Sequence, residues 1–198
     1  MSGTSSFRVF EIANGSFTVN ISGLTISNGH GADGVSGSDG ASGGGILNNP
    51  SATLNLDSVI VSGNQSGAAG SGGGFYGGFG GGISNLGTLT LTNSTVTNNQ
   101  AGSGTSAGNT GGFGGGISNG GRSSNPGTLT ITNSTISNNT SGASVCTEVP
   151  AAASRIILYQ TSTFCSSTIS NNVAGAGCDL SCAGGRAAAY TTLRVRVC

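Results

Sequence analysis

Charge is the scarcest property of this chain. Charged residues make up 6% of its 198 residues, lysine and tryptophan are absent, and the formal net charge is zero. Proteins that bind nucleic acid neutralise its phosphates with clustered lysine and arginine. Six basic residues balanced by six acids supply no such field. We therefore expect no nucleic-acid partner.

Long apolar runs are missing as well. No stretch reaches the roughly 20 apolar residues of a transmembrane helix. The opening residues, MSGTSSFRVFEIANGS, contain neither the basic nor the apolar region of a signal peptide. We expect no membrane insertion by this segment, and we expect it to be a fragment of a longer protein.

Glycine is abundant instead, at 39 residues. Such a composition fits either a disordered low-complexity chain or a repetitive β protein. Isoleucine, valine and threonine fall at fixed places, which favours the repeat. The phrase GTLTLTNSTVTNN at 87–99 returns as GTLTITNSTISNN at 127–139. Four copies align, at 18–29, 53–64, 88–99 and 128–139, and a fifth, degenerate copy ends at 167–172.

Four apolar columns run through the aligned copies. Within TLTLT, leucine alternates with threonine, and this period of two puts the leucines on one face of a strand and the threonines on the other. Each repeat thus contains three short strands, which is too compact for the four strands of a propeller blade. The columns are Ile12, Ile46, Ile83 and Ile117; Val19, Leu54, Leu89 and Leu129; Ile21, Leu56, Leu91 and Ile131; and Ile26, Val61, Val96, Ile136 and Ile169.

The repeat predicts an all-β fold, a right-handed parallel β-helix (solenoid) of about five coils with long Gly-rich loops. The handedness follows the preference of parallel crossovers. Two columns are asparagine, which tolerates tight left-handed turns and can form hydrogen-bonded ladders along a stack. The two predicted ladders are Asn14, Asn48, Asn85 and Asn119, and Asn64, Asn99, Asn139 and Asn172.

The chain divides into two parts. We expect β-helix repeats over 1–145, joined by extended or polyproline-II-like loops at 29–43, 66–80 and 101–114 that are either packed against the solenoid or mobile. Residues 146–198 are expected to form a degenerate last coil and a C-terminal cap or tail. The segment RAAAYTTLRVRVC is either a cap strand or sequence foreign to the repeat. The pairing of the five cysteines stays open: Cys146, Cys165, Cys178, Cys182 and Cys198.

The repeat also resembles a known group of proteins. GGGI, at 43–46, 80–83 and 114–117, with its asparagine turn is similar to the GGA[ILV] and FxxN repeats of chlamydial polymorphic outer-membrane proteins. The longer phrase GGGISNxGTLTLTNSTVTNN resembles bacterial right-handed parallel β-helix surface proteins and autotransporter-like passengers. The resemblance covers 7–145 and 166–172. It implies a cell-surface or extracellular location and a passenger or stalk role in adhesion.

Residues for chemistry are dispersed. Polysaccharide lyases and pectinases share this fold but need converging carboxylates and a base. Asp33 and Asp39 share a loop that could hold calcium loosely, although a solvated loop is the simpler interpretation. We expect no catalytic site, cofactor or metal, and a polysaccharide-active enzyme stays an alternative. The ionisable residues considered are Glu11, His30, Asp33, Asp39, Asp57, Arg122, Glu148 and Asp179.

One surface pattern suggests binding. A T-x-T-x-T patch, similar to the face of insect antifreeze proteins, makes ice binding a second alternative, although threonine is also a common exposed strand residue. We favour a structural, adhesive segment that contacts carbohydrate or a host or cell-surface protein through neutral groups. The candidate binding residues are Thr88, Thr90, Thr92, Thr128, Thr130 and Thr132.

Overall fold

The structure is a computed structural model that describes residues 7–120, 127–145, 162–175 and 190–195, the last range as backbone only. The described residues form strands, turns and loops, with no helix among their elements. Accordingly, no helix in the described part of the chain is long and apolar enough to cross a membrane.

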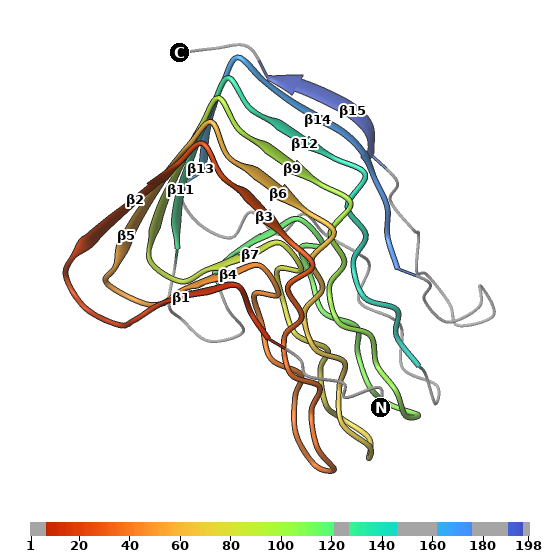
Figure 1. Ribbon diagram of the computed structural model, residues 1–198. Helices are drawn as coiled ribbons and strands as arrows, with labels where there is room; N and C mark the ends of the chain where they lie inside the picture. The colour runs from red at the N-terminus through yellow and green to blue at the C-terminus, as the bar shows by residue number, and fades with distance from the viewer. Residues whose placement is uncertain (1–6, 121–126, 146–161, 176–189, 196–198) are drawn as a thin grey trace.

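Three sheets run along the axis of a coil, and strands from successive turns are neighbours in each sheet (Figure 1). Sheet A contains β1 (Phe10–Ile12), β4 (Ile46–Asn48), β7 (Ile83–Asn85) and β10 (Ile117–Asn119). Sheet B contains β2 (Thr18–Ser22), β5 (Thr53–Asp57), β8 (Thr88–Thr92), β11 (Thr128–Thr132) and β13 (Ser162–Cys165). Sheet C contains β3 (Thr25–Ser27), β6 (Ile60–Ser62), β9 (Thr95–Thr97), β12 (Thr135–Ser137), β14 (Ser167–Asn172) and β15 (Tyr190–Val195).

The predicted all-β parallel β-helix is confirmed. Four complete turns each contribute one strand to every sheet, and β13 and β14 begin a fifth. All strand pairs are parallel except β14 with β15. The fold is therefore a parallel β-solenoid of about four turns.

The apolar columns fill the inside of the coil. In β8, Leu89 and Leu91 are fully buried while the three threonines that alternate with them are half-buried, as the alternation predicts. Their register partners in β11 are Leu129 and Ile131, so each leucine packs on the equivalent residue one turn away. The core consists of these stacked columns, and one turn cannot be changed without affecting its neighbours.

Left-handed residues turn the chain at two corners of each coil. Asn93 and Asn133 have φ values of 50° and 48°, and Asn98 and Asn138 have values of 55° and 56°. Asparagine tolerates this conformation better than other residues with a Cβ atom. The expected link between asparagine and turns thus holds, but it belongs to asparagines such as Asn98 and Asn138, which precede Asn99 and Asn139, and not to the ladder residues themselves.

The glycine-rich loops form a wing that projects from the corner between sheets C and A (Figure 1). The loops are neither mobile nor packed against the solenoid, the two alternatives predicted from the sequence. Their main chains instead form hydrogen bonds with each other. Gly34 N–H donates to Ala68 O at 2.8 Å in the next turn, and Gly78 N–H donates to Gly67 O at 2.8 Å across the two limbs of one loop. A Cβ atom on Gly102 would overlap Gly67 O, so these close approaches require glycine.

In the first turn, the register of β1 against β4 is shifted by two residues from the prediction. Phe10, not Ile12, pairs with Ile46, and Ile12 lies opposite Asn48. The predicted column of Ile12 with Ile46 is therefore wrong. Asn14 is exposed after the end of β1 and cannot belong to the ladder.

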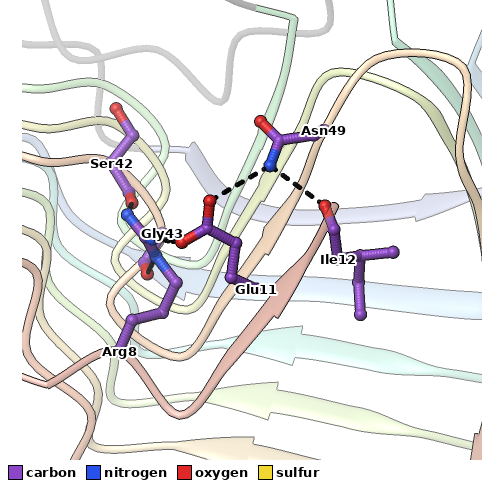
Figure 2. Close-up of polar contacts among 6 residues, drawn as sticks. All are labelled: Arg8, Glu11, Ile12, Ser42, Gly43 and Asn49. Atoms are coloured by element: carbon purple, nitrogen blue, oxygen red, sulfur yellow. Dashed lines mark hydrogen bonds and ion pairs between the residues drawn. The ribbon is translucent and has the colours of Figure 1, made fainter. Parts of the chain in front are cut away.

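Charged side chains anchor the observed register (Figure 2). Arg8 donates to the carbonyls of Ser42 at 2.7 Å and Gly43 at 2.9 Å, and its guanidinium pairs with Glu11 at 2.6 Å. Asn49 Nδ2 donates to Ile12 O at 3.0 Å. These contacts hold the start of β1 against the second turn with Phe10 and Ile12 directed inward.

The C-terminal part is described only in pieces. β15 pairs antiparallel with β14, which gives this edge of sheet C a closing strand, as a cap would. Cys165 is disulfide-bonded, and the other four cysteines lie outside the described residues. The division of the chain at residue 145 stays a prediction, because 146–161 and 176–189 also lie outside them.

Candidate binding face

The six predicted threonines lie together on the outer face of sheet B. Thr88, Thr90 and Thr92 alternate with inward leucines, and their register partners are the three threonines of β11. Thr128 is exposed and the other five are half-buried, so these side chains are partly accessible beside each other. Neighbouring strands lie about 4.8 Å apart and alternate residues about 6.6 Å apart, which spaces these hydroxyl groups on a grid.

The face continues beyond these two strands. Its charged member within the described residues is Asp57, whose carboxylate accepts a hydrogen bond from Asn93 Nδ2 at 3.0 Å. Its columns read Thr18, Thr53, Thr88 and Thr128; Asn20, Asn55, Thr90, Thr130 and Thr163; and Ser22, Asp57, Thr92, Thr132 and Cys165. The threonine column is thus complete over all four full turns.

Sheet C carries a second hydroxyl face that the sequence analysis missed. The signal was present, because a T-x-[ST] triplet precedes the asparagine pair in most copies. The Thr97 and Ser137 hydroxyl oxygens lie 3.4 Å apart along one column. The two columns are Thr25, Ile60, Thr95, Thr135 and Thr168, and Ser27, Ser62, Thr97, Ser137 and Ser170.

The second predicted asparagine ladder is present and buried. Asn64 Nδ2 donates to Asn99 Oδ1 at 2.9 Å, and Asn99 and Asn139 continue the chain of bonds at 3.0 Å each to Asn172. Each Nδ2 also donates to a carbonyl of the preceding turn, as Asn99 does to Val61 O at 2.9 Å. Each Oδ1 also accepts a main-chain N–H, as Asn99 does from Asn64 at 3.0 Å. The buried amides are therefore satisfied.

The first predicted ladder is shorter than expected. Asn48 Nδ2 donates to Asn85 Oδ1, and Asn85 Nδ2 to Asn119 Oδ1, both at 2.7 Å. Ile12 takes the position that the prediction gave to Asn14, and its side chain has no hydrogen-bond donor. Within the described residues, Asn48 Oδ1 is accordingly buried without a hydrogen-bond partner.

A serine ladder was not predicted. Ser94 N–H donates to Ser134 Oγ at 3.0 Å, and Ser134 N–H donates to Ser167 Oγ at 3.2 Å. The three serines are 3%, 3% and 6% exposed, so these bonds satisfy main-chain groups away from water. The sequence did not reveal this column for two reasons. Serine is common throughout the chain, and the first two turns have Leu24 and Val59 at the position of Ser94.

The acidic side chains of the loops hold neighbouring turns together. Asp33 Oδ1 accepts the Ala68 N–H at 2.7 Å, and Asp39 Oδ1 accepts the Tyr76 N–H at 2.8 Å. Among the described residues, no three histidine, cysteine, aspartate or glutamate side chains group as metal ligands would. His30 lies beside Gln65 in the next turn. Arg122, Glu148 and Asp179 lie outside the described residues.

Fold and surface together define a parallel β-solenoid with two hydroxyl-rich outer faces and buried amide and hydroxyl ladders. No family model matches the chain, and neither a curated protein nor a solved structure matches it. The fold alone therefore defines the structural class, a parallel β-solenoid.

Proposed function

We propose that this chain is a non-catalytic, adhesive segment of a cell-surface or secreted protein, which holds a neutral partner through the outer faces of sheets B and C. The supporting observation is that hydroxyl and amide side chains are in register over four to five turns. In the columns described above, from β2 to β14, the charged residue is Asp57. Neutral hydroxyl groups suit hydrogen bonding to carbohydrate or to an uncharged protein surface.

The hydrogen bonds of the acidic side chains support a structural role for the chain over an enzymatic one. Asp33, Asp39 and Asp57 each accept a hydrogen bond from another part of the fold, and Asp57 lies on sheet B, apart from the loop that Asp33 and Asp39 share. The similarity of the GGGI and TLTLTNSTVTNN repeats to bacterial β-helix passengers supports the surface location. A polysaccharide-active enzyme is the competing proposal, and release of unsaturated sugars from an acidic polysaccharide would establish it.

Binding should be tested on arrays of neutral polysaccharides and surface proteins, with salt raised from 0.1 M to 1 M. The Debye length falls from about 10 Å to about 3 Å over this range. We expect binding to change little, because few charges take part. Thr90→Tyr on sheet B and Thr95→Tyr on sheet C form a matched pair, since both residues are half-buried in the third turn. Binding that collapses in high salt would contradict the proposal.

Ice is the second candidate partner. The observation in its favour is the uninterrupted column of Thr18, Thr53, Thr88 and Thr128 beside a second, largely threonine column. Thermal hysteresis and inhibition of ice recrystallisation measure it directly. Activity in the unmodified chain that disappears in Thr90→Tyr but persists in Thr95→Tyr would assign ice binding to sheet B and replace the adhesive proposal.

Surface location needs its own test. Intact cells of the native host should be treated with protease and the fragments identified. The exposed wing residue Val35, at 75%, marks an accessible site. We expect wing peptides to be released from intact cells, and protection of the wing until the cells are lysed would contradict the location.

A further inference from the structure

The glycine-rich wing has two limbs in each turn, one leaving sheet C and one returning to sheet A (Figure 1). The returning limb comprises 37–43, 74–80 and 108–114 in successive turns. Gly77 N–H donates to Thr110 O at 2.9 Å in the next turn. Gly78 N–H donates to Gly67 O at 2.8 Å in the other limb. With three residues per turn, as in a polyproline II chain, Phe79 and the residues three positions from it then face away from the other limb.

Three aromatic rings meet on this outward side. Tyr76 and Phe79 lie three residues apart, and Phe113 takes the place of Phe79 one turn later, where its carbonyl accepts Gly80 N–H at 2.9 Å. The ring centroids of Tyr76 and Phe79 are 6.4 Å apart, and those of Phe79 and Phe113 are 5.4 Å apart. These three residues are called the aromatic row below. All three are half-buried, so part of each side chain is accessible.

The two phenylalanine rings of the row overlap only in part. Their planes are inclined by 16°, which makes them a stacked pair. Carbon atoms in contact lie about 3.5–4.0 Å apart, so two rings placed directly over each other would have their centroids at that separation. The centroid distance of 5.4 Å therefore means that the rings are offset. Part of each flat ring face is thus not covered by the other ring.

Hydroxyl groups flank the aromatic row on both sides along the solenoid axis. Ser42 precedes Phe79 by one turn, and its Oγ accepts the Phe79 N–H at 3.0 Å. Within the described residues the Ser42 O–H makes no hydrogen bond of its own, so it can donate to a ligand. Thr110 follows Tyr76 by one turn, paired with it in a parallel bridge, and is half-buried. An apolar centre between hydroxyl groups suits a sugar ring, which carries C–H groups on its faces and hydroxyl groups on its rim.

The accessible area of the row favours a small ligand over a protein. An aromatic side chain buries about 150–250 Å² when fully covered, so three half-buried rings leave on the order of 200 Å² accessible. A stable protein interface covers about 800 Å² on each partner. Nucleic-acid bases also stack on aromatic rings, but their backbone needs a positively charged groove. Arg8 lies beside this limb, but it already pairs with Glu11 and donates to the Ser42 carbonyl.

We propose that the aromatic row binds an uncharged β-1,4-linked oligosaccharide, with one sugar ring per turn of the solenoid. Equatorial linkages keep such a chain flat and extended, so its C–H groups can lie against the uncovered ring faces of Phe79 and Phe113. Equivalent positions of successive turns are about 4.8 Å apart, which is close to the length of one hexose unit in such a chain. The site is separate from the faces of sheets B and C, so this proposal and the proposed function can fail independently.

Calorimetric titration of the full chain with cellohexaose and with the hexamer of β-1,4-linked N-acetylglucosamine tests the proposal. We expect at least one hexamer to bind. Phe79→Leu should weaken that binding about fivefold or more, because leucine is apolar but has no flat face. Phe75→Leu is the matched control, since Phe75 is also half-buried in this limb but lies outside the ring contacts of the row, and it should bind as the unmodified chain does. Circular dichroism confirms that both variants are folded.

The place of binding has a separate test. In saturation-transfer difference NMR, irradiation of the aromatic protons should reach the C–H protons of the bound hexamer, and Phe79→Leu should reduce this transfer. No binding of either hexamer, equal affinities of Phe79→Leu and the unmodified chain, or equal losses in Phe75→Leu and Phe79→Leu would each overturn the proposal. Hexamer binding that is lost in Thr90→Tyr but kept in Phe79→Leu would also overturn it, and would assign the sugar to sheet B instead.

Discussion

Asn99→Ala tests whether the buried asparagine ladder stabilises the coil. Asn99 is 1% exposed, and its Oδ1 accepts hydrogen bonds from Asn64 N–H at 3.0 Å and Asn64 Nδ2 at 2.9 Å. Alanine removes the acceptor and leaves both donors of Asn64 without it, in a place that water does not reach. The Val61 carbonyl loses its bond from Asn99 Nδ2 as well.

The magnitude follows from these two donors. A buried donor without a partner costs about 1–3 kcal/mol, and the Asn64 side chain keeps its other bond, to Ile26 O. We therefore expect a loss of about 3 kcal/mol in the free energy of unfolding. For a chain of this size, that corresponds to a decrease in Tm of roughly 6–12 °C.

Thermal unfolding followed by circular dichroism measures the effect, and Asn98→Gly is the control. Asn98 is exposed and has a φ of 55°, which glycine adopts without strain, so its Tm should change little. If Asn99→Ala and Asn98→Gly have the same Tm, the ladder does not contribute as described and the reasoning is refuted.

Three further substitutions test other parts of the coil. Leu91→Asp should abolish the β circular dichroism signal, because Leu91 is fully buried, whereas Thr90→Asp on the outer face should keep it; equal loss would contradict the assignment of faces. Ser134→Ala should cost about 1–3 kcal/mol in unfolding experiments by leaving Ser94 N–H unpaired, and an unchanged stability would show that the serine ladder is dispensable. Gly102→Ala should make the wing cleave faster in limited proteolysis while the β signal is retained, since its Cβ atom would overlap Gly67 O; unaltered cleavage would argue against the close approach.

The middle of the coil could be predicted because its repeats are nearly identical. The leucines of β8 and the apolar residues of β11 occupy the same places in TLTLT and TLTIT, so their register is unambiguous. The first turn offered two registers, since Ile12 and Asn14 have the same spacing as Ile46 and Asn48. The connection between the first and second strands varies in length from turn to turn, so spacing could not decide. The hydrogen bonds from Arg8 to the Ser42 and Gly43 carbonyls, 34 and 35 residues away in the sequence, stabilise the observed register.

Other features depended on contacts that no single repeat reveals. The wing forms because glycine N–H groups bond to loops of neighbouring turns, and composition alone was equally consistent with mobile loops. The hydroxyl face of sheet C was overlooked because its triplet is shorter than T-x-T-x-T. The threonines of sheet B alternate with inward leucines as the period of two predicts, but their role in binding stays a prediction, because many surfaces offer the same hydroxyl chemistry.

The asparagine ladder also has a consequence for the order in which the chain folds. Its side-chain bonds connect residues 33 to 40 positions apart, always one turn to the next and never the first turn to the last. A completed turn thus offers acceptors and donors to its neighbour, and the loop that must close stays within 33 to 40 residues at each step. Once two neighbouring turns have paired, the folded part of the coil can extend from them turn by turn in either direction.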